Sequence, residues 1–189
     1  GPAWQAAMRA RETINAVAKV RLHVVSAGFG LLSEDDVVPA YSASFSPGED
    51  QVAARVCGDT PDASKHRAWW AAINELRGRP MPLANRLRGD VALIALGQNY
   101  IEAVADDLAE LVARRGTKAI WLVACAQLPR HHTPALQAAR LPLDWRFEHL
   151  RPGPRCSVNN RALEWLATDV APTVGWDRAQ VEQKVITLL

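Results

Sequence analysis

The stretch VVSAGFGLL, residues 24–32, places a hydroxyl group and two glycines where an apolar run ends. Ser26 closes the run, and Gly28 and Gly30 flank Phe29 in the turn that follows. Because glycine has no Cβ, its backbone N–H can approach a bound anion or base closely. The spacing matches neither the GxGxxG of dinucleotide-binding folds nor a phosphate loop with its lysine. The turn is therefore a candidate ligand site, and the alternative is a tight strand-to-loop turn whose apolar side chains fill the core.

Acidic and phenolic side chains follow this turn. Glu34, Asp35 and Asp36 are consecutive, and Tyr41 lies in the same irregular segment. Carboxylates can act in acid–base chemistry or hold a hard metal ion, and a phenol can stack on or hydrogen-bond a ligand. We predict that Ser26 and Tyr41 contact a base and that Asp36 is an acid or base, so these three are the candidate catalytic residues. The alternatives are acids favoured by the dipole of a helix start and, for the tyrosine, a half-buried loop anchor.

The stretch GQNY joins a second apolar run to a helical pattern. The amides of Gln98 and Asn99 can hydrogen-bond a base edge, and a helix start attracts phosphate. The stretch resembles the Gly-Gln-Asp-Pro-Tyr loop of uracil-DNA glycosylases, but the aspartate and proline are absent, so the water-activating chemistry is not carried over. Gly97, Gln98, Asn99 and Tyr100 are candidate ligand-binding residues. The alternative is that Asn99 is a plain helix cap.

Two basic stretches come later in the chain. In PRHHTP, Arg130 and His131 are expected to contact phosphate. Adjacent histidines point in different directions on a regular element, so we predict no metal site there, and no cofactor elsewhere. In RPGPRCSVNNR, Arg155, Asn159 and Arg161 stand at a predicted helix start, which suits a phosphate group. Capping and ordinary surface charge are the alternative for this second stretch.

Three predicted strands must position these residues. Residues 21–27, 90–98 and 118–126 are apolar runs typical of buried strands, and residues 144–150 are predicted as a fourth, edge strand. The clearest helix, residues 99–116, separates the second and third strands and forms a βαβ unit with them. Because the carboxyl ends of parallel strands share one edge of a sheet, we expect the loops after Ser26, after Gly97 and after Cys125 to converge there.

The remaining helices are expected over residues 3–19, 49–57, 63–77, 157–170 and 176–189, with a loop over 77–90. The apolar face of the first is predicted to include Trp4, Ala7 and Met8. Predicted caps are Ser157 and either Gly175 or Asp177. The fold class is α/β, with a small, mostly parallel sheet of about four strands and helices on both faces. The chain length suits a single domain over residues 1–189.

Composition excludes several classes of protein. No apolar run reaches the length of about 18–20 residues that a membrane span needs, and no signal peptide is visible, so a cytoplasmic protein is expected. The three cysteines show no CxxC spacing, which argues against a zinc site or a disulfide framework. The net charge of +2 does not by itself indicate nucleic acid. Arginine supplies 18 of the 22 basic side chains, as a GC-rich genome or phosphate recognition would produce.

Three stretches taken in order resemble one family. LHVVSAGFGLLSEDDVVPAYSASFS is similar to the Ser-Ala-Lys-Tyr-Gly-Leu-Leu…Pro-Tyr stretch of small bacterial and phage proteins, and to Ser-Gly-Leu-Tyr-Gly-Leu-Leu…Pro-Tyr of the YaaA peroxide-stress family. DVALIALGQNYIEAV and RPGPRCSVNNRALEWL resemble the later strand–Gly–x–x–Tyr–helix segment and the C-terminal turn and helix. The matched positions are Ser26, Gly28, Gly30, Leu31, Leu32, Tyr41, Gly97 and Tyr100.

This sequence departs from the family at two positions and lacks one segment. Phe29 stands where the family usually has tyrosine, and Ala40 is inserted between Pro39 and Tyr41. The family's upstream strand, with its Cys-Ser and Lys, has no counterpart here, so its groups are expected to be missing or to come from another chain.

The resemblance implies an α/β core similar to that of uracil-DNA glycosylases and to domains of archaeosine-type RNA modification enzymes. It also implies a DNA or RNA partner and a role in bacterial base modification, stress response or phage defence. Recognition or modification of a nucleobase is the expected function, and catalysis is left open. One alternative is a non-catalytic subunit that docks a protein partner or a second copy through tryptophan-bearing faces. A weaker alternative is a metal-dependent nucleotide hydrolase.

Overall fold

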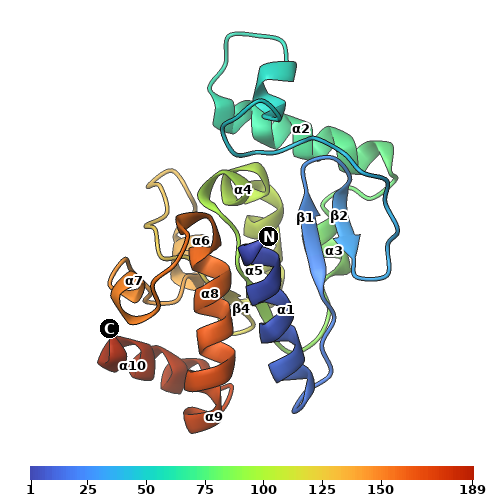
Figure 1. Cartoon of the computed structure of the whole chain (residues 1–189). Coiled ribbons are helices and arrows are strands. Elements are labelled where there is room, and N and C mark those ends of the chain that lie inside the picture. Colours follow the sequence, from blue (N-terminus) through green and yellow to red (C-terminus); the bar gives the residue numbers. More distant parts are fainter. The chain divides into compact units, whose positions relative to one another are not determined.

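The computed structural model describes residues 1–189 as a mixed α/β protein (Figure 1). The chain forms two compact units. Unit one contains Gly1–Val20, Gly89–Gly97 and Arg115–Leu189, and unit two contains Arg21–Arg88 and Gln98–Arg114. A single domain over the whole chain stays a prediction.

Unit one is built on two parallel strands. β3 (Ala92–Ile94) pairs with β4 (Ile120–Leu122), with Ala92 opposite Ile120. Between them the chain passes through α4 (Gln98–Ala103) and α5 (Ala105–Arg115), the strand–helix–strand order that the sequence predicts. The predicted single helix is divided at Val104, and Gly116, at a φ of 75°, follows its end. The parallel pairing of these two strands is therefore confirmed.

Helices make up the rest of unit one, and α1 packs along α8 (Figure 1). The first helix buries Ala6 and Ala10; of the predicted apolar face, Ala7 and Met8 are half-buried, whereas Trp4 is half exposed, so that face is correct only in part. Asp177 caps the last helix by accepting the N–H of Gln180 at 3.0 Å, as one of the two predicted caps. Ser157 makes no capping bond; its hydroxyl donates to the Pro154 carbonyl instead. The helices are α1 (Pro2–Asn15), α6 (Pro134–Ala139), α7 (Phe147–Leu150), η2 (Arg155–Ser157), α8 (Val158–Trp165), η3 (Leu166–Val170), α9 (Ala171–Val174) and α10 (Arg178–Leu188).

Unit two contains an antiparallel hairpin, in which β1 (His23–Ser26) pairs with β2 (Gly30–Ser33). Three further helical segments belong to it besides α4 and most of α5: η1 (Val52–Arg55), α2 (Asp62–Leu76) and α3 (Pro82–Arg86). The long helix α2 packs on α4, on η1 and on β2 (Figure 1). It thereby covers the segment in which the hairpin reverses direction.

The four-stranded, mostly parallel sheet is not present, because the strands form two separate pairs. β1 turns back onto β2 instead of joining β3 and β4. The reason is local: Ser26 pairs with Gly30 across a three-residue loop, and Gly30 has a φ of 70°, which glycine tolerates. The predicted fold class is thus right in its mixed α/β character and wrong in its sheet.

Two further element predictions are wrong. Residues 144–150, predicted as an edge strand, contain helix α7, because Asp144 accepts the N–H of Arg146 at 2.8 Å and its carbonyl accepts that of Phe147 at 3.1 Å. Residues 77–90, predicted as a loop, contain α3, which begins at Pro82, a residue preorganised for a first helical turn.

Candidate functional site

The hydroxyl of Ser26 organises the hairpin turn. Its Oγ accepts the N–H of Gly28 at 3.2 Å and of Phe29 at 3.0 Å, and it donates to the Tyr41 hydroxyl at 2.8 Å. Only 2% of the residue is exposed. Because the hydroxyl both accepts and donates within the turn, it holds Tyr41 to the hairpin. The catalytic role of Ser26 and Tyr41 stays a prediction.

The ring of Tyr41 lies on the turn at Gly28. A Cβ on Gly28 would come within 2.4 Å of Tyr41 Cδ2, so the ring takes the space that any other residue would fill. Phe29 meets the same ring edge to face, with centroids 5.1 Å apart and planes at 82°. Tyr41 is nevertheless 45% exposed. The turn therefore presents a fixed, partly exposed aromatic ring.

Helix α2 holds the other side of the turn. Trp69 Nε1 donates to the Ala27 carbonyl at 2.7 Å, and the Arg77 guanidinium donates to the Phe29 carbonyl. Asn74, which is 1% exposed, accepts the N–H of Leu31 at 3.2 Å. These bonds satisfy backbone groups of the turn and restrain it.

Gly30 is required by the same packing. Its φ of 70° lies in the left-handed region, and a Cβ there would come within 2.3 Å of Asn74 Oδ1. Since Asn74 is buried and hydrogen-bonded, it has no room to withdraw. Gly30 is thus needed for the shape of the hairpin, and its predicted role in ligand binding stays a prediction.

Three arginines gather next to β2. Arg86 donates to the Leu31 carbonyl at 3.4 Å and to Ser33 Oγ at 3.1 Å. Asp36 accepts the Ser33 N–H at 2.8 Å, and this bond, followed by the charges of Arg79, Arg77 and Arg86, lowers the pKa of its carboxyl. A carboxylate with a lowered pKa is a weaker base, so the geometry gives Asp36 a turn-stabilising contact while its acid–base role stays a prediction.

A buried carboxylate positions Arg86. Asp107, 2% exposed, accepts the N–H of Leu83 at 2.9 Å and of Ala84 at 2.8 Å, which fixes the start of α3. Burial raises the pKa of Asp107, and the two N–H groups oppose that shift. The predictions from the sequence do not include this anchor or the cluster Arg77, Arg79 and Arg86. The signal available was the density of arginine in RGRPMPLANRLR, residues 77–88.

The remaining predicted residues of unit two lie in α4. Gln98 is exposed and Asn99 half-buried in its first turn. Tyr100 meets the fully buried Phe45 edge to face, with centroids 5.1 Å apart and planes at 85°. Phe45 in turn meets His66. The packing of Tyr100 is therefore that of an aromatic cluster within unit two.

In unit one, the strand ends meet at Asn159. Its amide donates to the Leu96 carbonyl at 2.6 Å and accepts the N–H of Cys125 at 3.0 Å. Gly97 follows directly and has open space around its Cα. The structure thus joins the ends of β3 and β4 to the start of α8, as the parallel pairing predicts. Burial raises the pKa of the Cys125 thiol to about 12, so this cysteine is not a ready nucleophile.

The arginines after α7 differ in exposure. Arg161 binds Glu148 at 2.6 Å and Ser157 Oγ at 3.2 Å and lies over the ring of Phe147, with 13% of its side chain exposed. Arg155, in contrast, is exposed and lies 5.5 Å from the ring centroid of Trp145. Arg161 therefore braces its loop, whereas Arg155 is open to a ligand.

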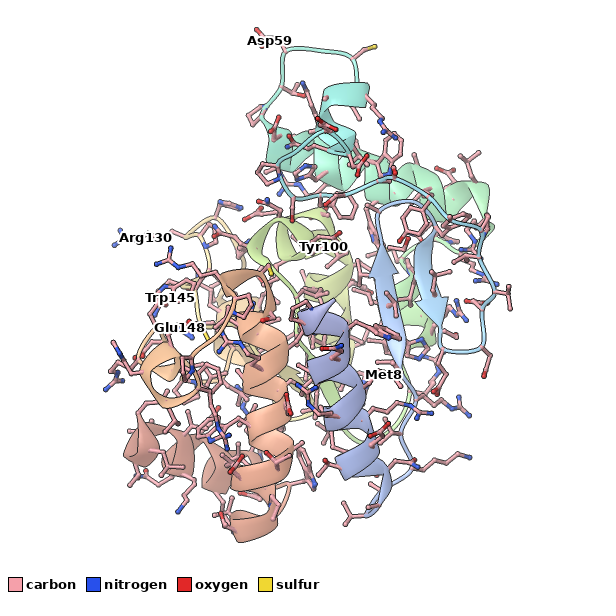
Figure 2. All side chains as sticks on the ribbon, in the orientation of Figure 1. Met8, Asp59, Tyr100, Arg130, Trp145 and Glu148 are labelled. Carbon is pink, nitrogen blue, oxygen red and sulfur yellow. The ribbon has the colours of Figure 1, made fainter.

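The PRHHTP loop is a turn rather than a regular element. His132 N–H bonds the Pro129 carbonyl at 3.1 Å, and the rings of His131 and His132 lie 4.5 Å apart. The expectation that the two rings point apart is therefore wrong. Arg130 is exposed and points away from its loop in Figure 2.

The predicted single rim is divided between the two units. Unit two holds Ser26, Gly28, Gly30, Asp36, Tyr41, Gln98, Asn99 and Tyr100. Unit one holds Gly97, Arg130, His131, Arg155, Asn159 and Arg161. One sheet edge does not unite the three predicted strand ends, because β1 belongs to the antiparallel hairpin.

The chain has no helix that is both long and apolar enough to span a membrane. Comparisons with protein-family models, with curated proteins and with solved structures found no match.

Proposed function

We propose that the chain binds single-stranded nucleic acid at the hairpin of unit two. The observation that carries the proposal is the half-exposed ring of Tyr41, fixed on Gly28 in a hairpin to which Arg77 and Arg86 donate hydrogen bonds. Single-strand binding proteins combine an aromatic stacking surface with positive charge along the backbone path. We call Tyr41, Phe29, Arg77, Arg79 and Arg86 the hairpin surface.

The aromatic part of this surface is preorganised. The hydrogen bond from Ser26 and the edge contact with Phe29 hold the Tyr41 ring before any ligand arrives. Stacking of one base on an aromatic ring contributes about 1–3 kcal/mol, and an ordered ring loses little entropy on binding.

The charged part is also oriented by the fold. Arg77 is tethered to the Phe29 carbonyl in the turn, and Arg86 to the Leu31 carbonyl of β2, so both guanidinium groups lie against the hairpin. Arg79, which is half-buried, contributes a third charge. A guanidinium fork donates two parallel hydrogen bonds, which suits a phosphate group.

The geometry favours recognition over base chemistry. Ser26 and Asp36 both stabilise backbone turns, so their side chains are already engaged within the fold. The resemblance of residues 22–46 to the YaaA family and its phage relatives supports a nucleic-acid partner. A cytoplasmic role in bacterial modification, stress response or phage defence is part of this proposal.

The test is a salt series with a matched pair of charge variants. Binding of a DNA or RNA strand of about 15 nucleotides is measured by anisotropy from about 50 to 200 mM salt. A plot of the logarithm of the binding constant against the logarithm of the salt concentration has a negative slope. We expect this slope to be shallower by about 0.7 in Arg79→Gln, because one phosphate contact is lost. Arg55→Gln, an exposed arginine on η1, removes the same charge from unit two and should leave the slope unchanged.

Two results would contradict the proposal. One is the absence of salt-dependent binding to any single strand. The other is an equal effect of the two substitutions, which would mean that only net charge matters.

A second candidate function is docking of a protein partner at the same hairpin. Leu76, the last residue of α2, is 88% exposed, and Val37, which follows Asp36, is 98% exposed. Large exposed apolar side chains are typical of interaction sites when they gather. Light scattering at rising concentration checks for a second copy: self-association that Leu76→Ser abolishes would favour this function over nucleic-acid binding.

A further inference from the structure

Unit one contains a pocket that none of the preceding predictions uses. Its volume is about 290 Å³. The walls come from the segment after β4, from the segment that follows α6, and from α10. This size is near the lower end of pockets that hold small organic ligands, about 300 Å³. The fold therefore offers room for a compact molecule rather than a nucleotide.

A fixed guanidinium forms the polar wall of the pocket. Arg140 Nη1 donates to the carbonyls of Ala124 at 3.1 Å, Leu141 at 3.0 Å and Leu143 at 2.5 Å. All three bonds use Nη1, so the backbone holds the guanidinium through one nitrogen, and Arg140 lines the pocket. An arginine anchored in this way presents its remaining donors at a defined place, with little entropy left to lose.

The second charged group of the pocket is already paired. Glu182 Oε1 accepts from Arg178 Nε at 2.6 Å. Arg178 is 12% exposed and is itself held by the carbonyls of Ile120 and Ala138, both at 2.8 Å. The charge of Glu182 is therefore compensated within the fold, and the pocket keeps the positive charge of Arg140. A single carboxylate on the ligand matches the one positive charge that the pocket keeps.

The rest of the wall is mixed: Gln127 and Gln137 are polar, whereas Leu128, Leu141, Pro142 and Ile186 form its apolar part. Leu128 and Leu141 are buried, and Ile186, on α10, is 56% exposed at the pocket's edge. Branched aliphatic walls favour a branched aliphatic ligand, because burial of each CH₂ contributes about 0.8 kcal/mol only when it is well packed.

We propose that this pocket binds a small carboxylate with a branched aliphatic body. The carboxylate lies on Arg140, and the aliphatic body packs against Leu128, Leu141 and Ile186. This chemistry has two sources: a simple branched-chain acid, or an α-amino acid whose ammonium group faces the second oxygen of Glu182.

Three probes of equal shape separate these sources. They are 4-methylpentanoate, which has only the carboxylate, leucine, which has both charges, and 3-methylbutylamine, which has only the ammonium. Saturation-transfer NMR and calorimetry on the full chain measure their binding. The first probe alone identifies a simple acid, and tighter binding of leucine identifies an amino acid; both support the proposal. Binding of the amine alone, or of none of the three, overturns it.

Two matched substitutions on α10 test whether the ligand binds in this pocket. Ile186→Glu adds negative charge at the pocket's edge and is expected to weaken binding of 4-methylpentanoate at least about tenfold, a change of 1.4 kcal/mol. Leu188→Glu makes the same change at an exposed position of the same helix outside the pocket, and should bind as the native chain does. Both positions are exposed, so both variants are expected to fold, which circular dichroism checks. Equal binding by the two variants would overturn the proposal.

Discussion

The hairpin of unit two and the parallel strand pair of unit one are each secured by a buried asparagine, used in different ways. The side-chain amide of Asn159 binds the segments after both strands: its NH₂ group donates to the Leu96 carbonyl, and its oxygen accepts the Cys125 N–H. Asn74 accepts from Leu31 of the hairpin but donates to Trp70 of its own helix. The first amide therefore closes a joint between two strands, while the second restrains only one strand.

The difference explains why the hairpin is the better functional candidate. At the ends of β3 and β4, the amide of Asn159 is fully engaged by the backbone and is not available to a ligand. At the hairpin, Ser26 and α2 restrain the backbone and leave the Tyr41 ring half exposed, while Arg77 and Arg86 bind carbonyls of the same hairpin. Rigid support below and exposed aromatic and charged groups above are what a binding surface needs.

The largest expected effect is on the hairpin's glycines. Gly30→Ala should lower the free energy of unfolding by about 4 kcal/mol, because left-handed strain and a clash with buried Asn74 combine. Gly28→Ala should cost only about 1 kcal/mol, because the exposed Tyr41 ring can swing away. Urea unfolding measures both.

Equal losses of unfolding free energy at the two glycines would show that Asn74 of α2 does not pack tightly against the hairpin at Gly30. Gly28→Ala also has a binding readout. Displacing the ring should weaken single-strand binding in a protein that remains folded.

A smaller effect separates the two asparagines. Asn159→Ala leaves the Cys125 N–H and the Leu96 carbonyl without their partner and should cost about 3 kcal/mol. Asn74→Ala removes the partner of one N–H, that of Leu31, and should cost about 2 kcal/mol. Asn160→Ala, at the half-exposed neighbouring position, is the control and should be close to neutral. A larger loss of stability in Asn74→Ala than in Asn159→Ala would contradict the view that Asn159 joins two strands and Asn74 restrains only one.

The smallest effects concern pH, and two aspartates of unit two should show opposite signs. The folded-state pKa of Asp107 is raised by burial, so its stabilisation is present at low pH and is lost as pH rises through that pKa. The folded-state pKa of Asp36 is lowered by the Ser33 N–H, so its stabilisation is present above about pH 4 and is lost as pH falls.

Urea unfolding of the native chain, Asp107→Asn and Asp36→Asn between about pH 3 and 7 measures these slopes. The stability difference between native and Asp107→Asn should shrink as pH rises. That between native and Asp36→Asn should shrink as pH falls. Slopes of the same sign would contradict the assigned environments.

Local patterns predicted much of the fold. The strands around Val24, Leu93 and Trp121, the helix after Asp62 and the cap at Asp177 follow from apolar runs and helix-start residues. The hairpin was also within reach, because two apolar runs separated by three residues that include glycine are a hairpin signal. The predicted irregular segment includes residues 30–33 instead, and the predicted sheet is wrong for that reason.

Contacts distant in sequence were beyond such patterns. Trp69, Asn74 and Arg77 bind hairpin groups more than 40 positions away, and no periodicity encodes such pairs. The grouping of Ser26 with Tyr41 came from motif order, and the structure joins them by a hydrogen bond. Their predicted chemistry requires free groups, however, and only the tertiary fold reveals that the serine hydroxyl is already engaged.

The most direct test of the hairpin surface is single-strand binding by three variants at Tyr41. Tyr41→Phe keeps the ring and loses the hydroxyl that accepts from Ser26, whereas Tyr41→Leu loses the ring. Tyr41→Trp enlarges the stacking surface. If a base stacks here, Phe and Trp should bind within about threefold of the native chain and Leu should bind about tenfold more weakly. Leucine binding as well as phenylalanine would contradict the account.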